Sequence, residues 1–282
     1  MKIAKTIKSV KTAVKAVRKA GRTIGLVPTM GALHHGHVSL IERSIRHDDF
    51  VVVSIFVNPT QFGPKEDLAK YPRPLREDLR ICEDNGVDVV FVPSAREMYR
   101  QEELAWISVD KISEPLCGRF RPGHFRGVAT VCAKLFNIVQ PDLAYFGQKD
   151  AQQFAVIKRM VADLNMPLKI VGCPTVREAD GLALSSRNRY LSPQQRKDTV
   201  CIYRSLKTAR EMIEAGEAIP KTSVAKIRNI ITVAKSLSSI DYISIVDAET
   251  LQDVSRIMGT VLIAIAARFG STRLIDNLTV DC

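Results

Sequence analysis

Apolar and polar residues follow one another along this chain in blocks that predict alternating strands and helices. Thr23–Pro28, Phe50–Val57 and Val87–Val92 are short, almost continuous apolar runs rich in β-branched residues. Such runs are typical of strands that are buried on both faces of a parallel sheet. Two further runs, at residues 142–146 and 168–172, complete the series. Because helical segments separate the runs, we predict a doubly wound parallel α/β sheet.

The predicted helices are recognised by apolar residues at helical spacing. Pro74–Gly86 is predicted to begin at its proline and to end at its glycine, and Val128–Gln140 is a second, largely apolar helix. Trp106–Val109 is predicted as a short edge strand. In the N-terminal segment the apolar stripe of a surface helix consists of Ile7, Val10, Val14 and Val17.

The pattern changes after Ser192-Pro193, which is predicted as a helix N-cap followed by proline in the first turn. Helices at about 193–216 and 221–236 precede strands Tyr242–Val246 and Thr260–Arg268, so this part is α+β rather than wound α/β. We therefore predict a large domain at 1–175 and a smaller α+β domain at 176–282. The polar stretch near 176–190 is the natural hinge between them.

Composition favours a soluble, folded enzyme or binding protein. Hydrophobic residues make up 46% and charged residues 25% of the 282 residues, and no apolar run approaches the length of a membrane span. The net charge is +11, but every charged residue of Met1–Arg22 is basic, so the excess is largely local. A transit peptide or nucleic-acid arm has this composition too. We favour a surface helix, because no linker or cleavage-like site precedes the first strand, and we expect neither nucleic acid nor a membrane as partner.

The six cysteines indicate free thiols. They are scattered, mostly within apolar segments, and form no C-x-x-C pair. A reducing cytoplasm is therefore the expected compartment. The cysteines are Cys82, Cys117, Cys132, Cys173, Cys201 and Cys282.

A glycine-containing loop, Thr29–His37, connects the first buried strand to a helix. A strand, tight turn and helix in this order direct backbone N–H groups at a nucleotide phosphate. His34 and His37 are three residues apart at the helix start, so both imidazoles can meet the same anion. A zinc site is disfavoured, since no Cys or acidic residue lies beside them at ligand spacing. Two solvated loop histidines remain the alternative.

Two further loops carry polar candidates. Asn58 and Gln61 lie just beyond the end of a buried strand, where open α/β sheets bind ligands, although ordinary turn chemistry explains an Asn-Pro pair equally well. Residues 118–127 are dense in glycine and cations. They are either a mobile flap that reaches an anionic ligand or a rigid solvated loop. The cations concerned are Arg119, Arg121, His124 and Arg126.

A second strand-to-helix phosphate site is predicted at Gly147–Asp150. Asp150 can cap the helix that begins at residue 151, which leaves Lys149 beside the first turn. Gln153, four residues beyond Lys149, faces the same side. Farther along, Ser185, Ser186 and Arg187 offer two hydroxyls and a guanidinium in consecutive positions, a compact anion clamp.

These segments together, in this order, closely resemble the pantoate–β-alanine ligase (pantothenate synthetase) family. The resemblance extends over essentially the whole chain, including Val246–Leu251 and Ala267–Asn277. The family belongs to the nucleotidyltransferase superfamily related to class I aminoacyl-tRNA synthetases. Its H-x-G-H signature resembles His34–His37, and the counterpart of the second, K-M-S-K-S-type signature is Leu184–Arg187, which departs in having leucine where methionine is common. The matching segments are 29–37, 58–62, 121–127, 147–150 and 184–188.

The resemblance implies a Rossmann-like, nucleotidyltransferase-type sheet with a smaller C-terminal α+β lid. It also implies ATP-dependent condensation of (R)-pantoate with β-alanine, which gives the coenzyme A precursor pantothenate, AMP and pyrophosphate through a pantoyl-adenylate intermediate. Mg²⁺ is expected as an ion carried by ATP, without a metal site in the protein. A cytoplasmic homodimer is expected.

Site residues follow from the same resemblance. His37 is expected to be the proton donor, assisted by His34, while Lys149 and Arg187 hold phosphate oxygens. Gln61 and Gln153 are expected to bind pantoate, and Gln61 also β-alanine. The ATP-binding residues implied are Met30, Gly31, Ala32, Leu33, His34, His35, Gly36, His37, Gly147, Gln148, Lys149, Asp150, Val176, Leu184, Ser185, Ser186 and Arg187.

Two alternatives remain at this point. One is an adenylyltransferase on the same fold, which leaves AMP on its product and needs no pocket for an amine. The other is a basic nucleotide- or RNA-binding protein without chemistry. The N-terminal cations lack the interleaved aromatic residues that stack on bases, which disfavours the second alternative.

Overall fold

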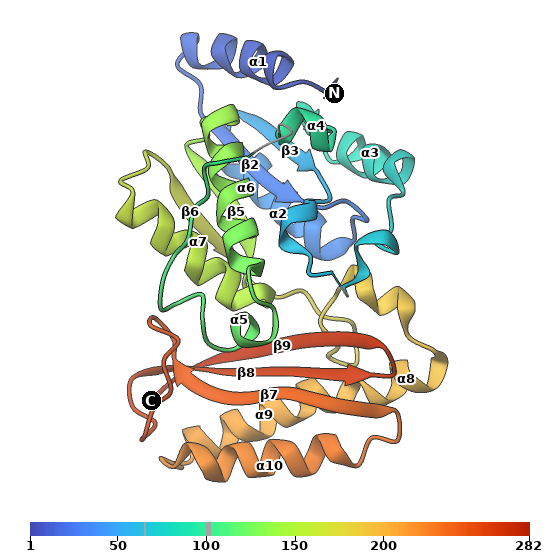
Figure 1. The fold of residues 1–282 in the computed structure, drawn as a ribbon, viewed down its shortest axis with the longest axis vertical. Coiled ribbons are helices and arrows are strands. Elements are labelled where there is room, and N and C mark those ends of the chain that lie inside the picture. The colour runs from blue at the N-terminus through green and yellow to red at the C-terminus, as the bar shows by residue number, and fades with distance from the viewer. Residues whose placement is uncertain (65, 100–102) are drawn as a thin grey trace. The chain divides into compact units, whose positions relative to one another are not determined.

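The computed structural model describes residues 1–64, 66–99 and 103–282 (Figure 1). The chain divides into two compact units. The first contains the described residues of 1–110, 121–148 and 153–174, and the second contains 111–120, 149–152 and 175–282. The two short internal segments, which the sequence-based division at 175 places in the first domain, group with the second unit.

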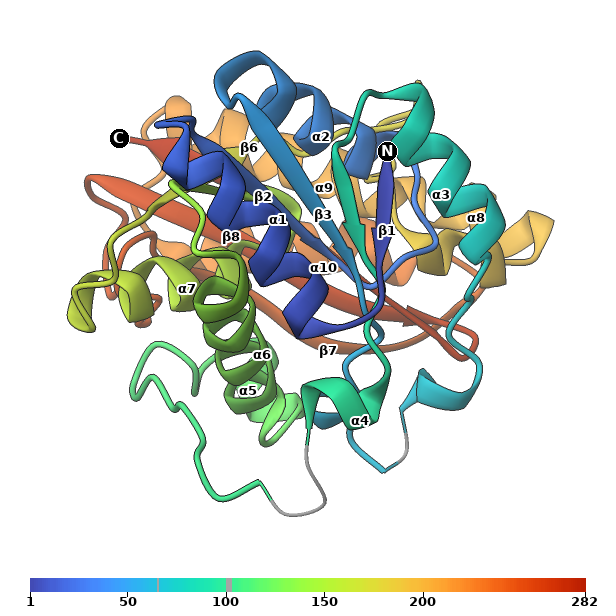
Figure 2. The ribbon, with the colours of Figure 1, turned by 90° about the horizontal axis from the view of Figure 1, so that it is seen from above.

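A six-stranded sheet organises the first unit, and all its strand pairs are parallel (Figure 2). The strand order is β1-β4-β3-β2-β5-β6. Helices cover both faces, so the predicted doubly wound α/β sheet is confirmed. The strands are β1 (Lys2–Ala4), β2 (Ile24–Thr29), β3 (Phe50–Ile55), β4 (Val89–Phe91), β5 (Leu143–Gly147) and β6 (Lys169–Cys173).

Successive strand residues enter two different cores, as the two-residue repeat of a strand requires. Leu26 and Val52 pack with α1, α6 and α7 on one face. Val27 and Val53 pack with α2 and α3 on the other. The continuous apolar runs of the sequence are explained by this burial on both sides. The helices are α1 (Ile7–Lys19), α2 (His35–His47), α3 (Leu75–Asp84), α4 (Ala95–Met98), α6 (His124–Val139) and α7 (Ala151–Asp163).

The N-terminal segment forms the expected surface helix. Thr6 caps α1 by accepting a hydrogen bond from the Ser9 N–H, and the valine stripe of the helix is buried. The strand β1, which precedes this helix, was not predicted.

The short edge strand predicted at 106–109 is wrong. The Ile107 N–H donates to Thr130 Oγ1 at 3.0 Å instead of to a neighbouring strand.

The second unit is built on a three-stranded antiparallel sheet in the order β7-β8-β9. Apolar residues of α9 and α10 pack against this sheet. Ser192 caps α8 as predicted, but the single helix predicted at 193–216 is divided into α8 and α9, and β9 was not predicted. The elements are α8 (Pro193–Asp198), α9 (Val200–Glu214), α10 (Pro220–Thr232), β7 (Leu237–Asp247), β8 (Thr260–Phe269) and β9 (Thr272–Asp281).

All six cysteines are free, as predicted, and Cys282 alone among them is exposed. Burial raises the pKa of the Cys82 and Cys132 thiols to about 12, so both remain protonated at neutral pH. Within the described part of the chain, no helix combines the length and apolar character needed to cross a membrane.

A carboxyl group is buried beneath the sheet of the first unit. The hydroxyls of Tyr145 and Ser44 donate to Asp48 Oδ2 at 2.7 and 2.8 Å. The other oxygen, Oδ1, has no hydrogen-bond partner among the described residues. Burial raises the pKa of Asp48 above its ordinary value, and the two hydroxyl hydrogen bonds offset this only in part.

Candidate active site

The strand order reverses between β2 and β5. From β2 the chain proceeds to β3 and β4 on one side, whereas β5 and β6 lie on the other. Open α/β sheets bind ligands outside the carboxyl ends of the strands at such a switch point. The loop Met30–His34 follows β2, and the 3₁₀ turn η3 (Gln148–Asp150) follows β5. Two of the predicted phosphate-binding segments therefore leave the sheet from adjacent strand ends.

The loop after β2 is fixed by an acidic residue that the sequence analysis missed. Gly31 and Ala32 both have positive φ angles, 78° and 49°. Asp78, which is 1% exposed in α3, accepts the Ala32 N–H at 2.9 Å and the Leu33 N–H at 2.7 Å. A Cβ at Gly31 would lie 2.8 Å from Asp78 Oδ2, so only glycine fits this turn without a shift.

The backbone of this loop differs from the expected phosphate cradle. The Gly31 N–H donates to Thr29 Oγ1, the next two N–H groups donate to the buried carboxylate, and the His34 N–H donates to His37 Nδ1. These N–H groups shape the loop instead of facing a ligand. The groups of this loop that remain suited to an anion are the two imidazoles and the positive end of the α2 dipole.

His34 and His37 are built into the start of α2. His34 is the N-cap and accepts the Gly36 N–H on Nδ1 at 3.1 Å. His37 accepts the His34 N–H on Nδ1 at 3.3 Å. The ring centroids are 4.1 Å apart. Because both Nδ1 atoms accept hydrogen bonds, each ring in its neutral form carries its proton on Nε2.

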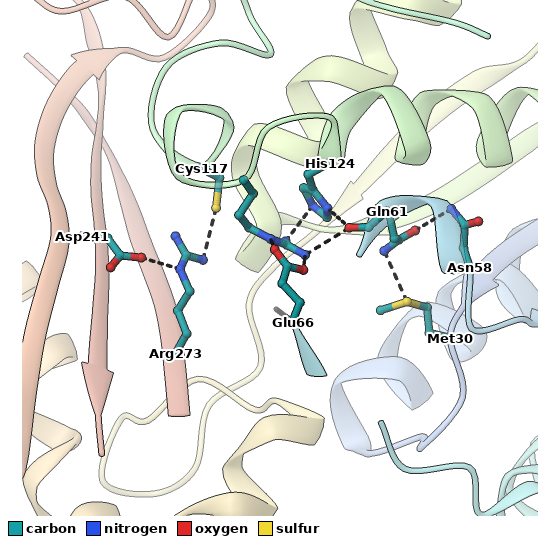
Figure 3. A network of polar contacts seen from close by, with 9 residues as sticks. Met30, Asn58, Gln61, Glu66, Cys117, His124, Asp241 and Arg273 are labelled. Atoms are coloured by element: carbon teal, nitrogen blue, oxygen red, sulfur yellow. Dashed lines mark hydrogen bonds and ion pairs between the residues drawn. The ribbon is translucent and has the colours of Figure 1, made fainter. Parts of the chain in front are cut away.

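Gln61 lies against the same loop (Figure 3). It ends the 3₁₀ turn η1 (Pro59–Gln61), which Asn58 caps, and it is 8% exposed. Asn58 Nδ2 donates to Gln61 Oε1 at 3.0 Å, and Gln61 Nε2 contacts Met30 Sδ at 3.3 Å. The structure therefore brings the predicted pantoate residue Gln61 beside the predicted ATP residue Met30.

An ion-pair network holds the backbone of Gln61. His124 Nδ1 donates to the Gln61 carbonyl oxygen at 2.8 Å, and His124 Nε2 accepts from Arg121 at 2.9 Å. Arg121 also binds both oxygens of Glu66, at 2.8 and 2.6 Å. Burial raises the pKa of Glu66, but the hydrogen bonds and charge of Arg121 outweigh this and lower it overall. Arg121 and His124 thus support Gln61, and the sequence analysis missed Glu66.

The predicted flap is largely helical. Its residues lie in the short helix α5 (Cys117–Phe120) and in the first turn of α6, and the Arg126 guanidinium lies 4.6 Å from the centre of the Trp106 ring. Gly127 lets α6 approach η1, since a Cβ there would lie 2.8 Å from Gln61 Cα. Its carbonyl oxygen also accepts from Asn58 Nδ2 at 3.2 Å.

Several other predicted ATP residues lie in the second unit. The Leu184 N–H donates to the Val176 carbonyl at 3.0 Å. Ser185 caps the 3₁₀ turn η4 (Ser186–Tyr190) by accepting the Arg187 N–H. Lys149 Nζ is 3.7 Å from Asp150 Oδ2. The predicted residues that belong to the first unit are Met30–His37, Gln61, Gly147, Gln148 and Gln153, and those of the second are Lys149, Asp150, Val176 and Leu184–Arg187.

The parallel sheet, with its histidine-containing loop at the switch point, defines a nucleotide-binding α/β protein. Residues 2–279 match the family described as pantoate-beta-alanine ligase. A pantothenate synthetase of Acetivibrio thermocellus is 54% identical over 281 residues, which cover 100% of both chains.

Solved structures agree. The pantothenate synthetase of Thermus thermophilus superimposes with a TM-score of 0.93 at 44% identity, covering 99% of each chain. The pantoate-beta-alanine ligase of Francisella tularensis, complexed with beta-gamma ATP and beta-alanine, gives a TM-score of 0.79 at 36% identity, covering 99% of this chain and 97% of that one. The chain belongs to the pantoate–β-alanine ligase family, so the family resemblance is confirmed and the chain is a ligase.

Proposed function

We propose that this enzyme condenses (R)-pantoate with β-alanine at the expense of ATP. Pantothenate, AMP and pyrophosphate are the products, and pantoyl adenylate is the intermediate. The pantoate carboxylate attacks the α-phosphorus and displaces pyrophosphate, and the β-alanine amine then attacks the acyl carbon and displaces AMP. The observation that carries this proposal is the family match over residues 2–279. The Francisella relative complexed with beta-gamma ATP and beta-alanine supports it.

In this reaction His34 and His37 act on the phosphates. Both rings lie at the positive end of α2, and both present Nε2 as their proton-bearing nitrogen. Charge builds up on the bridging oxygen as pyrophosphate leaves, and a positioned donor stabilises that charge. His37 supplies the proton in our proposal, while His34 binds a phosphate oxygen and keeps the helix start in shape.

Lys149 and Arg187 hold the pyrophosphate oxygens, and the remaining predicted ATP residues line the nucleotide. Lysine is suited as a point charge and arginine as a planar pair of donors. Among the described residues there is no cluster of three His, Cys, Asp or Glu side chains that could hold a metal ion. From the family resemblance we propose that Mg²⁺ is carried by the phosphates of ATP, where it would neutralise part of their charge.

The two glutamines serve the acid substrate. An amide both donates and accepts hydrogen bonds, which suits the hydroxyls and carboxylate of pantoate. Gln61 is oriented by Asn58 and by its carbonyl contacts with His124 and Arg121, and it also lies near β-alanine in our proposal. No protein nucleophile is needed, because positioning of the ligands supplies much of the acceleration.

The second unit is proposed to act as a lid that hinges near residues 176–190 and protects the adenylate from water. Unchanged small-angle scattering on addition of ATP and pantoate would argue against a large closure. A homodimer is proposed from the family resemblance, and sedimentation equilibrium would test it.

A product assay tests the reaction itself. Release of AMP and pyrophosphate is expected to require both pantoate and β-alanine. Adenylyl transfer to an acceptor without any need for the amine would instead indicate an adenylyltransferase, and nucleotide binding without turnover would indicate a binding protein.

Replacing Gln153 by alanine is expected to raise the KM for pantoate by about tenfold, because one hydrogen bond to a charged ligand is lost. The KM for ATP should stay within about twofold of the parent value, since ATP makes no comparable contact with this amide in our proposal. Steady-state kinetics with each substrate varied in turn would show this. Gln252→Ala, at an exposed glutamine, is the control. Equal damage to both KM values would refute the assignment of Gln153 to the pantoate pocket.

A further inference from the structure

Strand β9 presents two different faces. It is an edge strand of the second unit's sheet, paired only with β8 among the described strands (Figure 1). Leu274 and Val280 belong to the core shared with α9 and α10. Because side chains alternate along a strand, Arg273 and Asn277 point to the opposite face of this sheet.

That opposite face is contacted by the two internal segments that group with the second unit, 111–120 and 149–152. Arg273 Nη1 donates to Cys117 Sγ at 3.3 Å, and Arg273 Nε binds Asp241 at 2.6 Å (Figure 3). Four residues farther along β9, Asn277 Nδ2 donates to the Lys149 carbonyl oxygen at 2.8 Å. One strand therefore holds both segments.

Gln152 joins the two segments to each other. Its Oε1 accepts the Cys117 N–H at 2.9 Å, and its Nε2 donates to the carbonyl oxygens of Ile112 and Pro115 at 3.1 and 2.7 Å. With the two contacts of β9, these hydrogen bonds close a ring through the turn 149–152. The turn is thus fixed at its first residue, Lys149, by Asn277, and at its last residue, Gln152, by segment 111–120.

Asn277 itself is rigidly placed. Its N–H donates to Asp276 Oδ1 at 2.8 Å. Asp276, whose side chain is 3% exposed, receives two hydrogen bonds from Arg177, at 2.6 and 2.9 Å. The Arg177 guanidinium lies 4.0 Å from the centre of the Tyr203 ring. A buried, two-pronged ion pair stacked on an aromatic ring leaves this part of β9 little freedom.

We propose that Asn277 is a positioning residue for the adenylate-forming step. By holding the Lys149 carbonyl it sets the main chain from which the Lys149 ammonium extends toward the pyrophosphate oxygens. A displacement of about 1 Å at a reacting centre can cost on the order of 10²-fold in rate, so a single main-chain hydrogen bond at this turn is significant. The inference rests on the proposed function, because it presumes that Lys149 binds the phosphates.

Two replacements of Asn277 test the proposal. Asn277→Asp keeps the shape but places an acceptor against the Lys149 carbonyl, and Asn277→Leu removes the donor without adding charge. Both are expected to lower kcat for pantoate-dependent ATP–pyrophosphate exchange by about tenfold. The KM for pantoate, and the rate at which supplied pantoyl adenylate reacts with β-alanine, should be unchanged. Asn229→Asp, at an exposed asparagine of α10, is the matched control.

The second half-reaction separates positioning from a general loss of structure, because misfolding would lower both halves alike. All variants are compared well below the lowest unfolding temperature among them. In a Lys149→Ala background, Asn277→Asp should add less than about a twofold further loss, since the two residues act as one unit. Unchanged exchange in both Asn277 variants, an equal loss in the second half-reaction, or full additivity with Lys149→Ala would overturn the proposal. If Lys149→Ala alone leaves exchange intact, the proposed role of Lys149 itself fails.

Discussion

Replacing His37 by alanine is expected to lower the rate of adenylate formation by about 10²- to 10⁴-fold, the usual contribution of a positioned proton donor. Stability should fall by only about 0.5–1 kcal/mol, because the lost hydrogen bond to the His34 N–H is a helix-capping contact at a partly exposed site. Pantoate-dependent ATP–pyrophosphate exchange measures the first effect, and urea unfolding measures the second.

His37→Asn separates capping from chemistry. The asparagine oxygen can still accept the His34 N–H, but the side chain has no imidazole to donate a proton. We expect this variant to be as inactive as His37→Ala. His47→Ala, at the exposed C-terminal end of the same helix, should retain full exchange. Near-normal exchange by His37→Asn would show that His37 contributes only to the shape of the helix start.

Replacing Asp78 by asparagine is expected to reduce adenylate formation by on the order of 10- to 100-fold and stability by about 1–3 kcal/mol. Asparagine can accept only one of the two N–H groups that Asp78 binds, at Ala32 and Leu33. The other N–H would face an amide NH₂ and remain buried and unpaired. The loop that leads to His34 would then lose its single conformation. Exchange kinetics and thermal unfolding would measure the two effects.

Asp84→Asn is the matched control, since Asp84 lies in the same helix at an exposed position near Arg80. It should change neither quantity appreciably, because exposed ion pairs contribute little. If Asp78→Asn destabilised the protein but left exchange at its parent rate when fully folded, the carboxylate would be a purely structural residue.

The interior strands of the parallel sheet could be predicted because burial on both faces requires a nearly continuous run of apolar residues. Phe50–Val57 is almost wholly apolar, and β3 was found there. The edge strands β1 and β9 have no such continuous apolar run. β1 contains only Lys2, Ile3 and Ala4. β9 carries polar residues on both faces, since Asp276 binds Arg177 on one and Asn277 holds Lys149 on the other.

The candidate site shows the same limit. The loops that follow β2 and β5 could be located because they lie between predicted strands and helices, and the family resemblance supplied roles for their residues. Asp78 and Glu66 could not be found this way. Asp78 binds backbone N–H groups 45 and 46 residues away, and Glu66 binds a side chain 55 residues away. The local sequence around an acidic residue does not show whether its carboxylate points into the protein or into solvent. Of the backbone N–H groups expected at the phosphates, those of Ala32 and Leu33 are occupied by the long-range contact with Asp78.

The opposed pKa shifts of Asp48 and Glu66 give the first unit a graded response to acid. Asp48 has its pKa raised above 3.8 in the fold, so its ionised form weakens the fold at higher pH, and the protonation that restores stability begins while pH is still falling toward 3.8. Glu66 has its pKa lowered from 4.5, so the stability it gains from Arg121 is present above pH 4.5 and is lost as pH falls through the lowered value. Acid therefore acts on the two carboxyls in opposite directions: protonation of Asp48 stabilises the fold, whereas protonation of Glu66 weakens its pair with Arg121. Loss of that pair is expected to loosen the Gln61 turn, and faster hydrogen exchange confined to the amides of 60–63 would reveal it. At low pH the proposed pantoate residue Gln61 would thus lose the support of Arg121 and Glu66, while Asp48 would no longer oppose folding.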